Sequence, residues 1–379
     1  MTIVRDRLAR LGRVRWLAAL GLVLFGLGIG LVLLEVLLRV VPGLMPLHAL
    51  ARVRFFRDLG TVQTRPDADL GFLYPPNVQA TMRLSEVSFK FSTDAHGFRN
   101  RQPWPARADV VALGDSLTFG FGVPDGHSWV DLAARGLGHP AVVNLALPGF
   151  GPLQELRVYE RFGAPLRPKL VLVGFFPAND FSDTARFLTW LGLDEGGNYL
   201  LWRDFGVTGR DKLTRLDRLL STSYLHSFLW SVLNPETREY GRRAIVHRTP
   251  QGRLRLHPGA LRALRQRASP SRPEFVETLD AFQRLDRLVR ADGGRVVILV
   301  LPSKEYVYLP LRRPMKRDPL ANVYTALDDR GLTYVNLAPL FRERAAAGER
   351  LFFEFDGHPN QRGYALIAEA VVRYVDTKL

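Results

Sequence analysis

Two kinds of apolar pattern occur along the chain, one long stretch near its start and several short runs further on. The long stretch, Leu17–Leu34, holds 18 residues without a charge. At about 1.5 Å per residue it reaches roughly 27 Å as a helix, close to the hydrocarbon thickness of a bilayer. Because it is apolar on every face, it predicts a membrane span rather than a buried helix of a globular domain.

A cleaved signal peptide is the alternative interpretation of this stretch. Such a peptide normally has an apolar region of about 7–15 residues with a small-residue cleavage site close behind it. The candidate site here, Ala49–Ala51, lies well beyond the apolar stretch, which favours an uncleaved anchor. Residues 1–15 hold five arginines against one aspartate, so the positive-inside rule predicts a cytoplasmic N-terminus and a periplasmic or extracellular remainder.

The short runs are rich in valine and alternate with segments of helical spacing. They comprise residues 109–113, 141–147, 170–176, 295–301 and 333–337. In the last helical segment Tyr364, Ile367, Ala368, Val371 and Val375 fall on one face. Strands that are apolar throughout and alternate with helices are typical of a parallel sheet covered on both sides. The pattern therefore predicts an α/β domain with about five parallel strands.

Two regions do not follow this alternation. Residues 42–105 lack a long helical pattern, and the alternation within 81–100 predicts a short hairpin. Residues 181–272 are first aromatic and then basic, and we interpret them as an insertion that forms a lid. The expected organisation is a basic tail (1–15), a transmembrane anchor (16–41), a linker with an accessory element (42–105), and a large domain (106–379) that carries the insertion.

The chain has a net charge of +15, and its meaning depends on where along the sequence the excess positive residues lie. Ten arginines and a single glutamate lie between Arg238 and Arg272, and this segment together with the tail accounts for most of the excess. A charge divided in this way argues against a nucleic-acid-binding protein. The segment is either a solvated basic surface or a contact for phosphate head groups or acidic polysaccharide. The chain has no cysteine, which excludes disulfides, thiolate metal sites and a cysteine nucleophile.

Polar residues follow several of the predicted strands, at the sheet edge where α/β proteins bind ligands. The stretch VVALGDSLTFG places Asp115 and Ser116 after the first strand. Gly149 follows the second strand, and Asn179 and Asp180 follow the third. Taken singly, a serine after a strand is more often a helix cap, the glycine an ordinary turn residue, and Asn-Asp a cap or Asx turn.

A further turn, before the final helix, carries Asp356 and His358. Hydrolysis through a serine needs a nucleophile, a base, a group that orients the base, and donors for the oxyanion. Ser116, His358 and Asp356 are the candidates for the first three roles. The backbone N–H groups of Ser116 and Gly149, with the side-chain amide of Asn179, are the candidate oxyanion donors. Their convergence on one sheet edge favours these roles over the separate structural ones.

These blocks resemble the SGNH hydrolase superfamily, also called GDSL esterases, which has a flavodoxin-like three-layer α/β/α fold. Gly-Asp-Ser-Leu at 114–117 matches the first block, Gly149 matches the second, and Asn179-Asp180 matches the third, with Pro177 where the family usually has glycine. The resemblance implies supporting roles for Asp115 and Asp180. The last block is usually Asp-x-x-His, whereas Asp356-Gly357-His358 has one residue fewer.

The resemblance implies an esterase that acts through an acyl-enzyme on an acylated substrate. The ester, for example an acetyl ester, would belong to an envelope glycan, a lipid or a small molecule, and we expect no cofactor and no metal. An O-acyltransferase for cell-surface polysaccharide would use the same residues and pass the acyl group to a sugar hydroxyl. A non-catalytic envelope scaffold is the remaining alternative, and the shortened Asp-x-His spacing is the feature in its favour.

Overall fold

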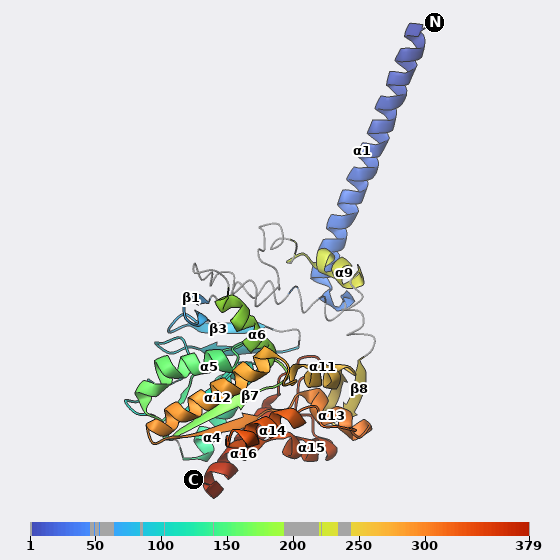
Figure 1. The fold of residues 1–379 in the computed structure, drawn as a ribbon. Helices are drawn as coiled ribbons and strands as arrows, with labels where there is room; N and C mark the ends of the chain where they lie inside the picture. Colours follow the sequence, from blue (N-terminus) through green and yellow to red (C-terminus); the bar gives the residue numbers. More distant parts are fainter. Residues whose placement is uncertain are drawn as a thin grey trace. The chain divides into compact units, whose positions relative to one another are not determined.

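The computed structural model describes most of the chain, as two units (Figure 1). The described residues are 2–45, 49, 53, 64–83, 86–101, 103–138, 140–192, 220, 222–233 and 244–378. One unit combines Met1–Arg57 with Thr214–Arg238, and the other combines Asp58–Leu213 with Glu239–Leu379. The second unit contains the α/β domain predicted from the sequence.

In the described residues of the first unit, the named elements are helix α1 (Thr2–Val40), a 3-10 turn (Pro42–Leu44) and helix α9 (Tyr224–Leu233). Within α1, Trp16–Val40 is long and apolar enough to cross a membrane, and none of its most apolar window is buried in protein. A membrane anchor and a signal sequence both fit such an N-terminal helix.

The second unit is built on a sheet of five parallel strands in the order β11-β10-β7-β5-β6. The strands are β5 (Val110–Gly114), β6 (Val142–Asn144), β7 (Leu170–Phe175), β10 (Arg295–Val300) and β11 (Tyr334–Asn336). All five coincide with the apolar runs, and only Gly114 of β5 extends beyond its run, so the prediction of a parallel sheet of about five strands is confirmed. Numbered along the chain, their order across the sheet is 2-1-3-4-5, which is the flavodoxin-like order. The chain adds strands on one side of β5 and then on the other, so the switch point lies between β5 and β7.

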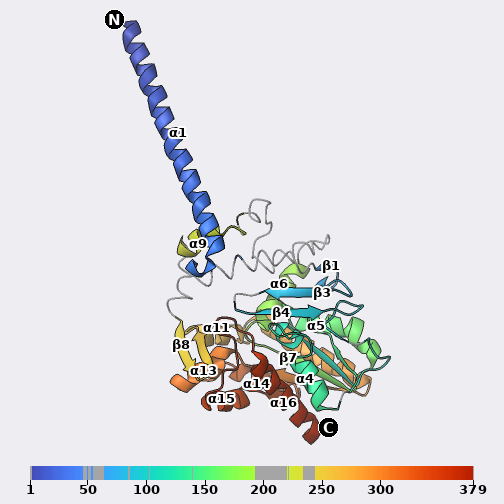
Figure 2. The same cartoon turned by 180° about the vertical axis from the view of Figure 1, so that it is seen from behind.

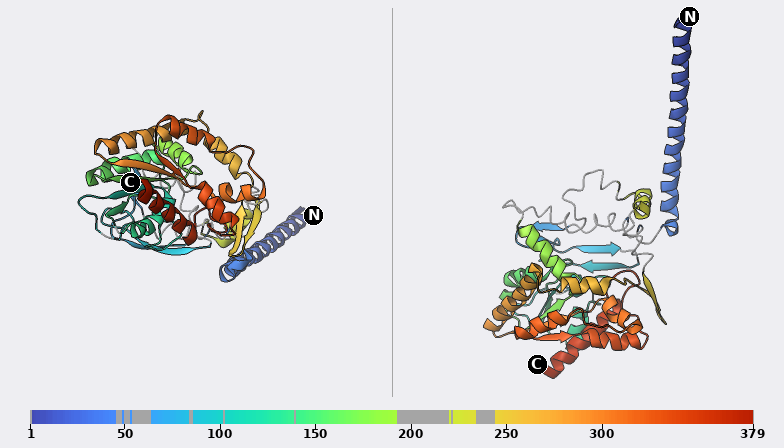
Figure 3. Two further views of the ribbon diagram at one scale, coloured as in Figure 1. Left: turned by 90° about the horizontal axis from the view of Figure 1, so that it is seen from below. Right: turned by 45° about the vertical axis from the view of Figure 1, so that its right-hand side comes forward.

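Each sheet face carries its own hydrophobic core, because successive residues of a strand point to opposite sides. Val111 and Val173 belong to the cluster on one face, and Ala112 and Leu172 belong to the cluster on the other. The first cluster includes side chains of α5 (Pro152–Val158), α6 (Asp180–Leu191) and α12 (Pro273–Ala291). The second includes side chains of α4 (Trp129–Gly136), α15 (Ala338–Ala346) and α16 (Gln361–Lys378). These three layers can be followed in Figure 3.

The remaining described helices of this unit are short. They are α3 (Ser116–Phe119), α11 (Ala260–Arg267), α13 (Lys304–Arg312) and α14 (Ala321–Asp329), with single turns at Tyr159–Gly163 and Ala164–Leu166. Helix α16 covers the sheet with the face predicted from the sequence, since Tyr364, Ile367 and Val371 are buried.

Two hairpins form the accessory element ahead of the sheet. The first pairs β1 (Arg65–Asp67) with β2 (Gly71–Leu73), and the second pairs β3 (Gln79–Arg83) with β4 (Ser88–Ser92). The second hairpin lies inside the region where alternation predicted one, apart from two residues at its start. Phe91 of β4 contacts Phe119 of α3 edge to face, with 5.2 Å between ring centroids. The accessory element is therefore packed directly behind the candidate nucleophile.

The predicted insertion, 181–272, is only partly described. Helix α6, with which it begins, buries Phe181 and Phe187 and packs beside α5 and α12. Near its other end, β8 (Ile245–Thr249) and β9 (Gly252–Leu256) form an antiparallel hairpin that leads to α11. Residues 193–219, 221 and 234–243 lie outside the described residues, and these include Arg238 and much of the aromatic part. The interpretation of this segment as a lid stays a prediction.

Candidate active site

Ser116 is lifted to the carboxyl edge of the sheet by a tight turn between β5 and α3. Gly114 has φ +148°, and a Cβ at this position would lie 2.2 Å from Thr118 Oγ1, so a larger residue could not be accommodated without a shift. Asp115 caps α3 by accepting a 2.8 Å hydrogen bond from Leu117 N. Ser116 is then the first residue of α3, where a backbone N–H has no partner within the helix.

The structure brings Ser116, His358 and Asp356 into one line of contacts. His358 Nε2 lies 2.7 Å from Ser116 Oγ, and His358 Nδ1 lies 2.5 Å from Asp356 Oδ1. The same Asp356 oxygen accepts a 2.8 Å hydrogen bond from the backbone N–H of His358. The shortened Asp-x-His spacing is thus compatible with contact between carboxylate and imidazole, because a two-residue Asx-type turn folds the aspartate back over the histidine.

The charges of this pair favour an ionised Asp356 next to a basic imidazole. Burial acts to raise the pKa of Asp356, but the charge of His358 and its hydrogen bonds outweigh burial and hold the pKa at about 2. For His358, burial acts to lower the pKa, yet the charge and hydrogen bond of Asp356, with a contribution from Asp115, raise it above its usual value. An imidazole made more basic in this way accepts a proton from a hydroxyl more readily.

Asp115 and Asn179 lie immediately behind Ser116. Asp115 is fully buried, and its Oδ2 lies 3.3 Å from Ser116 Oγ and 3.0 Å from Asn179 Nδ2. Asn179 Nδ2 also donates to Asp183 Oδ2 at 2.9 Å. Both amide hydrogens of Asn179 are therefore directed at carboxylates, although the sequence predicted that this amide would face an oxyanion.

Three further carboxyl groups are buried in this neighbourhood. Asp180 Oδ2 accepts a 2.6 Å hydrogen bond from Phe176 N, and Asp183 pairs with Arg186. Within the described part of the chain, neither carboxylate oxygen of Glu155 has a hydrogen-bond partner. Burial, reinforced by the neighbouring carboxylates, raises the pKa of Glu155 and of Asp180 well above the usual range. Burial also raises the pKa of Asp183 to about 7, against the opposing charge of Arg186.

Gly149 lies in the turn that follows β6, beside the same sheet edge. Its φ is +81°, which is a left-handed conformation that favours glycine. The turn is held to β5 by a 3.2 Å hydrogen bond from Leu147 N to Gly114 O. A Cβ at Gly149 would lie 4.0 Å from Arg186 Nη1. The three segments that carry Ser116, Gly149 and Asn179 therefore follow the three adjacent strands β5, β6 and β7.

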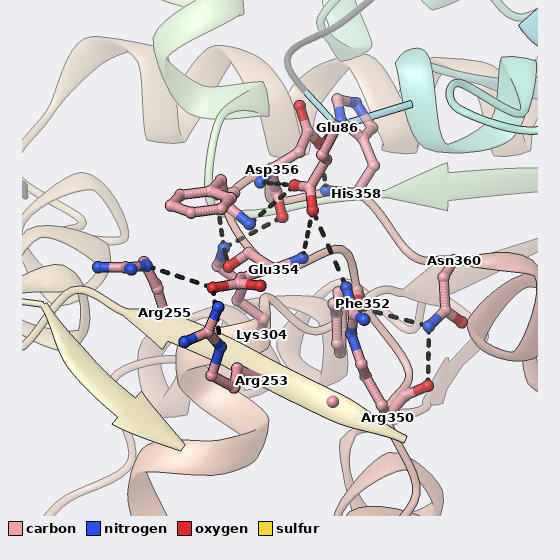
Figure 4. Close-up of polar contacts among 12 residues, drawn as sticks. Glu86, Arg253, Arg255, Lys304, Arg350, Phe352, Glu354, Asp356, His358 and Asn360 are labelled. Atoms are coloured by element: carbon pink, nitrogen blue, oxygen red, sulfur yellow. Dashed lines mark hydrogen bonds and ion pairs between the residues drawn. The ribbon is translucent and has the colours of Figure 1, made fainter. Parts of the chain in front are cut away.

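Two oppositely charged side chains, Glu86 and Lys304, bind the backbone of the loop that carries Asp356 (Figure 4). Glu86 accepts hydrogen bonds from the backbone N–H groups of Glu354, Phe355 and Asp356 at 2.8, 2.7 and 2.6 Å. Lys304 Nζ donates to the backbone carbonyls of the same three residues at 3.2, 2.7 and 3.1 Å. Lys304 is buried, and burial lowers its pKa although Glu305, Asp356 and Glu86 act to raise it.

Neither Glu86 nor Lys304 was predicted from the sequence. Glu86 precedes β4 in the accessory element, and Lys304 begins α13 after β10. No spacing rule connects these positions with residues 354–356. The one available signal is the place of Lys304 just after a sheet strand, an edge where polar residues are candidates for the site.

The hairpin β8–β9 adds arginines to the opposite side of this loop, as Figure 4 shows. Arg255 donates its backbone N–H to Glu354 O at 2.9 Å, and its Nε lies 3.3 Å from Glu354 Oε1. Its guanidinium carbon also lies 4.8 Å from the centre of the Phe355 ring. On the Asn179 side, Arg267 of α11 is exposed and donates to Ala178 O at 2.6 Å. Described arginines of the basic segment thus reach both sides of the candidate site.

Two more contacts support the nucleophile and the histidine. Buried Arg99 donates to the carbonyls of Phe119, Gly120 and Val123 at 3.0, 2.7 and 2.8 Å, which fixes the turn after α3. The Phe121 ring lies over His358, with 4.5 Å between centroids and 33° between planes. Among the described residues, no group of three or more His, Cys, Asp or Glu side chains has an arrangement that could hold a metal ion.

Comparison with known proteins finds similarity only among solved structures. No protein-family model matches the chain, and no curated protein matches its sequence. A lipolytic protein of the G-D-S-L family from Veillonella parvula is 13% identical, over 71% of this chain and 98% of that one, with a TM-score of 0.37. A GDSL-like lipase from Bacteroides thetaiotaomicron is 13% identical, over 74% and 93%, with a TM-score of 0.35. A third, described as a putative lipolytic protein of G-D-S-L family from Desulfitobacterium hafniense, is 13% identical, over 70% and 97%, with a TM-score of 0.33.

Proposed function

We propose that this chain is a serine ester hydrolase of the SGNH type, held at a membrane by α1, which cleaves an O-acyl ester through an acyl-enzyme. The observation that carries the proposal is the continuous contact from Ser116 Oγ through His358 to Asp356. A serine used only as a helix cap has no need of an imidazole at 2.7 Å whose far nitrogen is bound by a carboxylate. The matching motif blocks in the sequence support the same assignment independently.

In the first half of the proposed reaction, Ser116 Oγ attacks the ester carbonyl carbon while its proton moves to His358 Nε2. Asp356 remains ionised, keeps the imidazole in the useful tautomer and stabilises the imidazolium that forms. The tetrahedral intermediate then collapses, the bond to the alkoxy oxygen breaks, and the alcohol leaves with the proton from His358. Ser116 is left as an ester of the acyl group.

In the second half, His358 takes a proton from water as the water oxygen attacks the acyl carbon. Collapse of this intermediate releases the carboxylic acid and returns the proton to Ser116 Oγ. The reaction consumes one water and needs no electron carrier. An acyltransferase would differ in this half alone, with a sugar hydroxyl in place of water.

The oxyanion in both halves would be stabilised by the backbone N–H groups of Ser116 and Gly149. Asn179 would take part only by releasing one of its two carboxylate partners, Asp115 or Asp183. The raised pKa of Asp183, about 7, supports such an exchange, because a protonated carboxyl group binds an amide donor less strongly than a carboxylate does.

The proposed location is extracytoplasmic, with a single membrane crossing. It is supported by the span Trp16–Val40 and by the five arginines that precede it, which the positive-inside rule keeps in the cytoplasm. The α/β unit would then act in the periplasm or outside the cell.

The proposed substrate carries an anionic group near the ester, as an acidic envelope glycan or a phospholipid does. The support is the placement of Arg255 beside the Asp356 loop and of Arg267 beside the Asn179 loop. Arginine binds carboxylate and phosphate groups through several N–H donors at once. A guanidinium at each side of the site would favour such substrates over neutral esters.

The anionic preference is tested with paired nitrophenyl esters that differ only in a carboxylate on the acyl chain. The Arg267→Gln variant is expected to raise KM for the anionic ester about tenfold while leaving the neutral ester unchanged, since one charged hydrogen bond is worth roughly 1.5–3 kcal/mol. Arg373→Gln, which removes an exposed arginine paired with Glu369 on α16, is the matched control. Equal effects on both esters would contradict an anion site at Arg267.

The hydrolase itself is tested with full-length protein in detergent and p-nitrophenyl acetate. Turnover is expected in the wild type and in Ser271→Ala, a change at an exposed serine, and is expected to fall by at least three orders of magnitude in Ser116→Ala. If an added glycan hydroxyl captures the acetyl group in preference to water, the acyltransferase is favoured. Equal activity in the wild type and Ser116→Ala would overturn both enzymatic assignments.

A further inference from the structure

The end of α1 caps the start of α9, although nearly two hundred residues separate them in sequence. Glu35 accepts hydrogen bonds from Ser223 Oγ, Tyr224 N and Leu225 N at 2.9, 3.1 and 2.7 Å. The first N–H groups of a helix lack partners within it, and a negative charge at this end is favourable. Glu35 is also the first charged residue after the apolar stretch Leu17–Leu34. Helix α9 therefore begins at the level where α1 ceases to be purely apolar.

One side of α9 is packed against the segment that ends α1. Tyr224, Leu225 and Phe228 lie against a small cluster that includes buried Leu38 and Met45. In Figures 1 and 2, α9 lies crosswise beside this end of α1 rather than along it. The contact with α1 thus fixes which side of α9 faces outward.

The flank of α9 next to this packed side presents leucines to the surroundings. Leu229 is 44% exposed and Leu233, four residues later on the same face, is 76% exposed. Val36 and Val40 of α1 are also exposed in this unit, at 50% and 73%. The ten residues of α9, YLHSFLWSVL, include no Asp, Glu, Lys or Arg. An apolar face of this kind, on a helix that packs against the end of a candidate membrane span, is unfavourable in water.

We propose that α9 is an interfacial helix that lies in the surface of the membrane crossed by α1, with Leu229 and Leu233 in contact with lipid acyl chains. This inference rests on the membrane anchoring in the proposed function. A crosswise helix at the end of a span lies in the plane of the interface, where an apolar face can be buried by lipid. Tyr224 and Trp230 belong to the residue types enriched at this level. Arg39 forms an ion pair with Glu35 at 2.7 Å and lies over the Tyr224 ring.

The absence of cysteine from the chain allows a direct test by single-cysteine spin labelling. Leu229→Cys and Leu233→Cys in full-length protein would be labelled with a nitroxide in vesicles of phosphatidylcholine and phosphatidylglycerol. Collision rates with oxygen, which concentrates in lipid, and with a water-soluble nickel complex report the surroundings of each label. Leu24→Cys in the span is the lipid control, and Lys169→Cys, at a side chain 83% exposed, is the water control.

Labels at 229 and 233 are expected to collide with oxygen several-fold more often, relative to nickel, than the label at 169. Collision ratios at 229 and 233 equal to that at 169, with 24 in lipid, would overturn the proposal while leaving the anchor intact. Protection from both reagents would also overturn it, since a second protein surface would then cover α9. A label at 24 that behaves like the label at 169 would instead contradict the anchoring itself.

Discussion

The contact between Asp356 and His358 shows how a single turn sets the chemistry of an imidazole. One carboxylate oxygen binds both the backbone N–H and the ring Nδ1 of the histidine, so the ring orientation and the tautomer are fixed together. The raised pKa of His358 has Asp356 as its main favourable cause. Because a general base must be neutral, activity should fall as the pH decreases through a pKa that lies above the usual histidine value.

Asp356→Asn is expected to lower kcat/KM by a factor on the order of 10³–10⁴, because the amide favours the wrong imidazole tautomer. The acid limb of the pH–rate profile should also move to lower pH, since the charge that raises the pKa of His358 is removed. The measurement is kcat/KM for p-nitrophenyl acetate between pH 4.5 and 9. Asp280→Asn, at an exposed aspartate paired with Arg330, is the control. An acid limb that stays in place would contradict the assigned partner.

Motif residues and supporting residues differ in how far the sequence could predict them. Ser116, Asp356 and His358 were predictable because each lies in a turn next to a strand or helix with a strong periodic signal. The carboxylate partners of Asn179 were not, because Asp183 is buried three residues into α6 and its position depends on how that helix packs. Glu86 carries no local signal and Lys304 only its place just after β10, since their hydrogen bonds go to backbone groups that any sequence at 354–356 would supply.

The loop 354–356 is bound by Glu86 through its N–H groups and by Lys304 through its carbonyls. Through Glu86, the accessory element contributes to the position of Asp356. Glu86 takes three of the loop's N–H groups and Lys304 takes three of its carbonyls. Hydrogen bonds to charged groups are worth about 1.5–3 kcal/mol each. The two side chains are therefore positioning residues for Asp356 rather than participants in bond making.

Glu86→Gln is expected to lower kcat roughly tenfold with little change in KM, because the amide nitrogen cannot accept the bond from one of the three N–H groups. Glu160→Gln, at an exposed glutamate paired with Arg284, should have no effect. Lys304→Met provides a second measurement, the position of the acid limb of the pH–rate profile, which a merely structural role of Lys304 would not change. The charge of Lys304 lowers the pKa of His358, so its removal should move the acid limb to higher pH. Unchanged kcat in Glu86→Gln together with an unshifted limb in Lys304→Met would contradict this role.

The sequence predicted the buried strands of the sheet but not the short strands β1 and β2 of the accessory element, and the difference has a physical cause. The five sheet strands are buried on both faces and carry long apolar runs, which the sequence displays directly. The strands β1 and β2 have three residues each, too few for alternation to be recognised. The order β11-β10-β7-β5-β6 cannot be deduced from the runs, yet it places the ends of β5, β6 and β7 side by side and so assembles the site.

In the α/β unit as a whole, the buried carboxyl groups behind Ser116 should make stability depend on pH. Asp183 has a folded-state pKa of about 7, and burial raises the pKa of Glu155 and Asp180 as well. Over the range from about pH 4 to 7 the folded state thus binds more protons at these groups than the unfolded state does. The change in the free energy of unfolding with pH is proportional to the number of protons bound by the unfolded state minus the number bound by the folded state. These carboxyl groups therefore make the free energy of unfolding fall as the pH rises.

Glu155→Gln tests this dependence, because it replaces a carboxyl without hydrogen-bond partners by a neutral side chain of the same shape. We expect it to stabilise the α/β unit by roughly 1–3 kcal/mol at pH 7.5 and by much less at pH 4.5. Thermal unfolding of the full-length protein, followed by near-ultraviolet circular dichroism at the two pH values, provides the measurement. Glu277→Gln, at an exposed glutamate of α12, should change neither. Equal effects of Glu155→Gln at both pH values would contradict the raised pKa.

The most direct test of an activated serine is labelling of the full-length protein with a fluorophosphonate, followed by mass spectrometry of its peptides. The proposed triad predicts one adduct, on Ser116, that is lost in Ser116→Ala and forms far more slowly in His358→Ala. Labelling of folded wild-type protein that is absent, or that persists in Ser116→Ala, would contradict the assignment of Ser116 as the nucleophile.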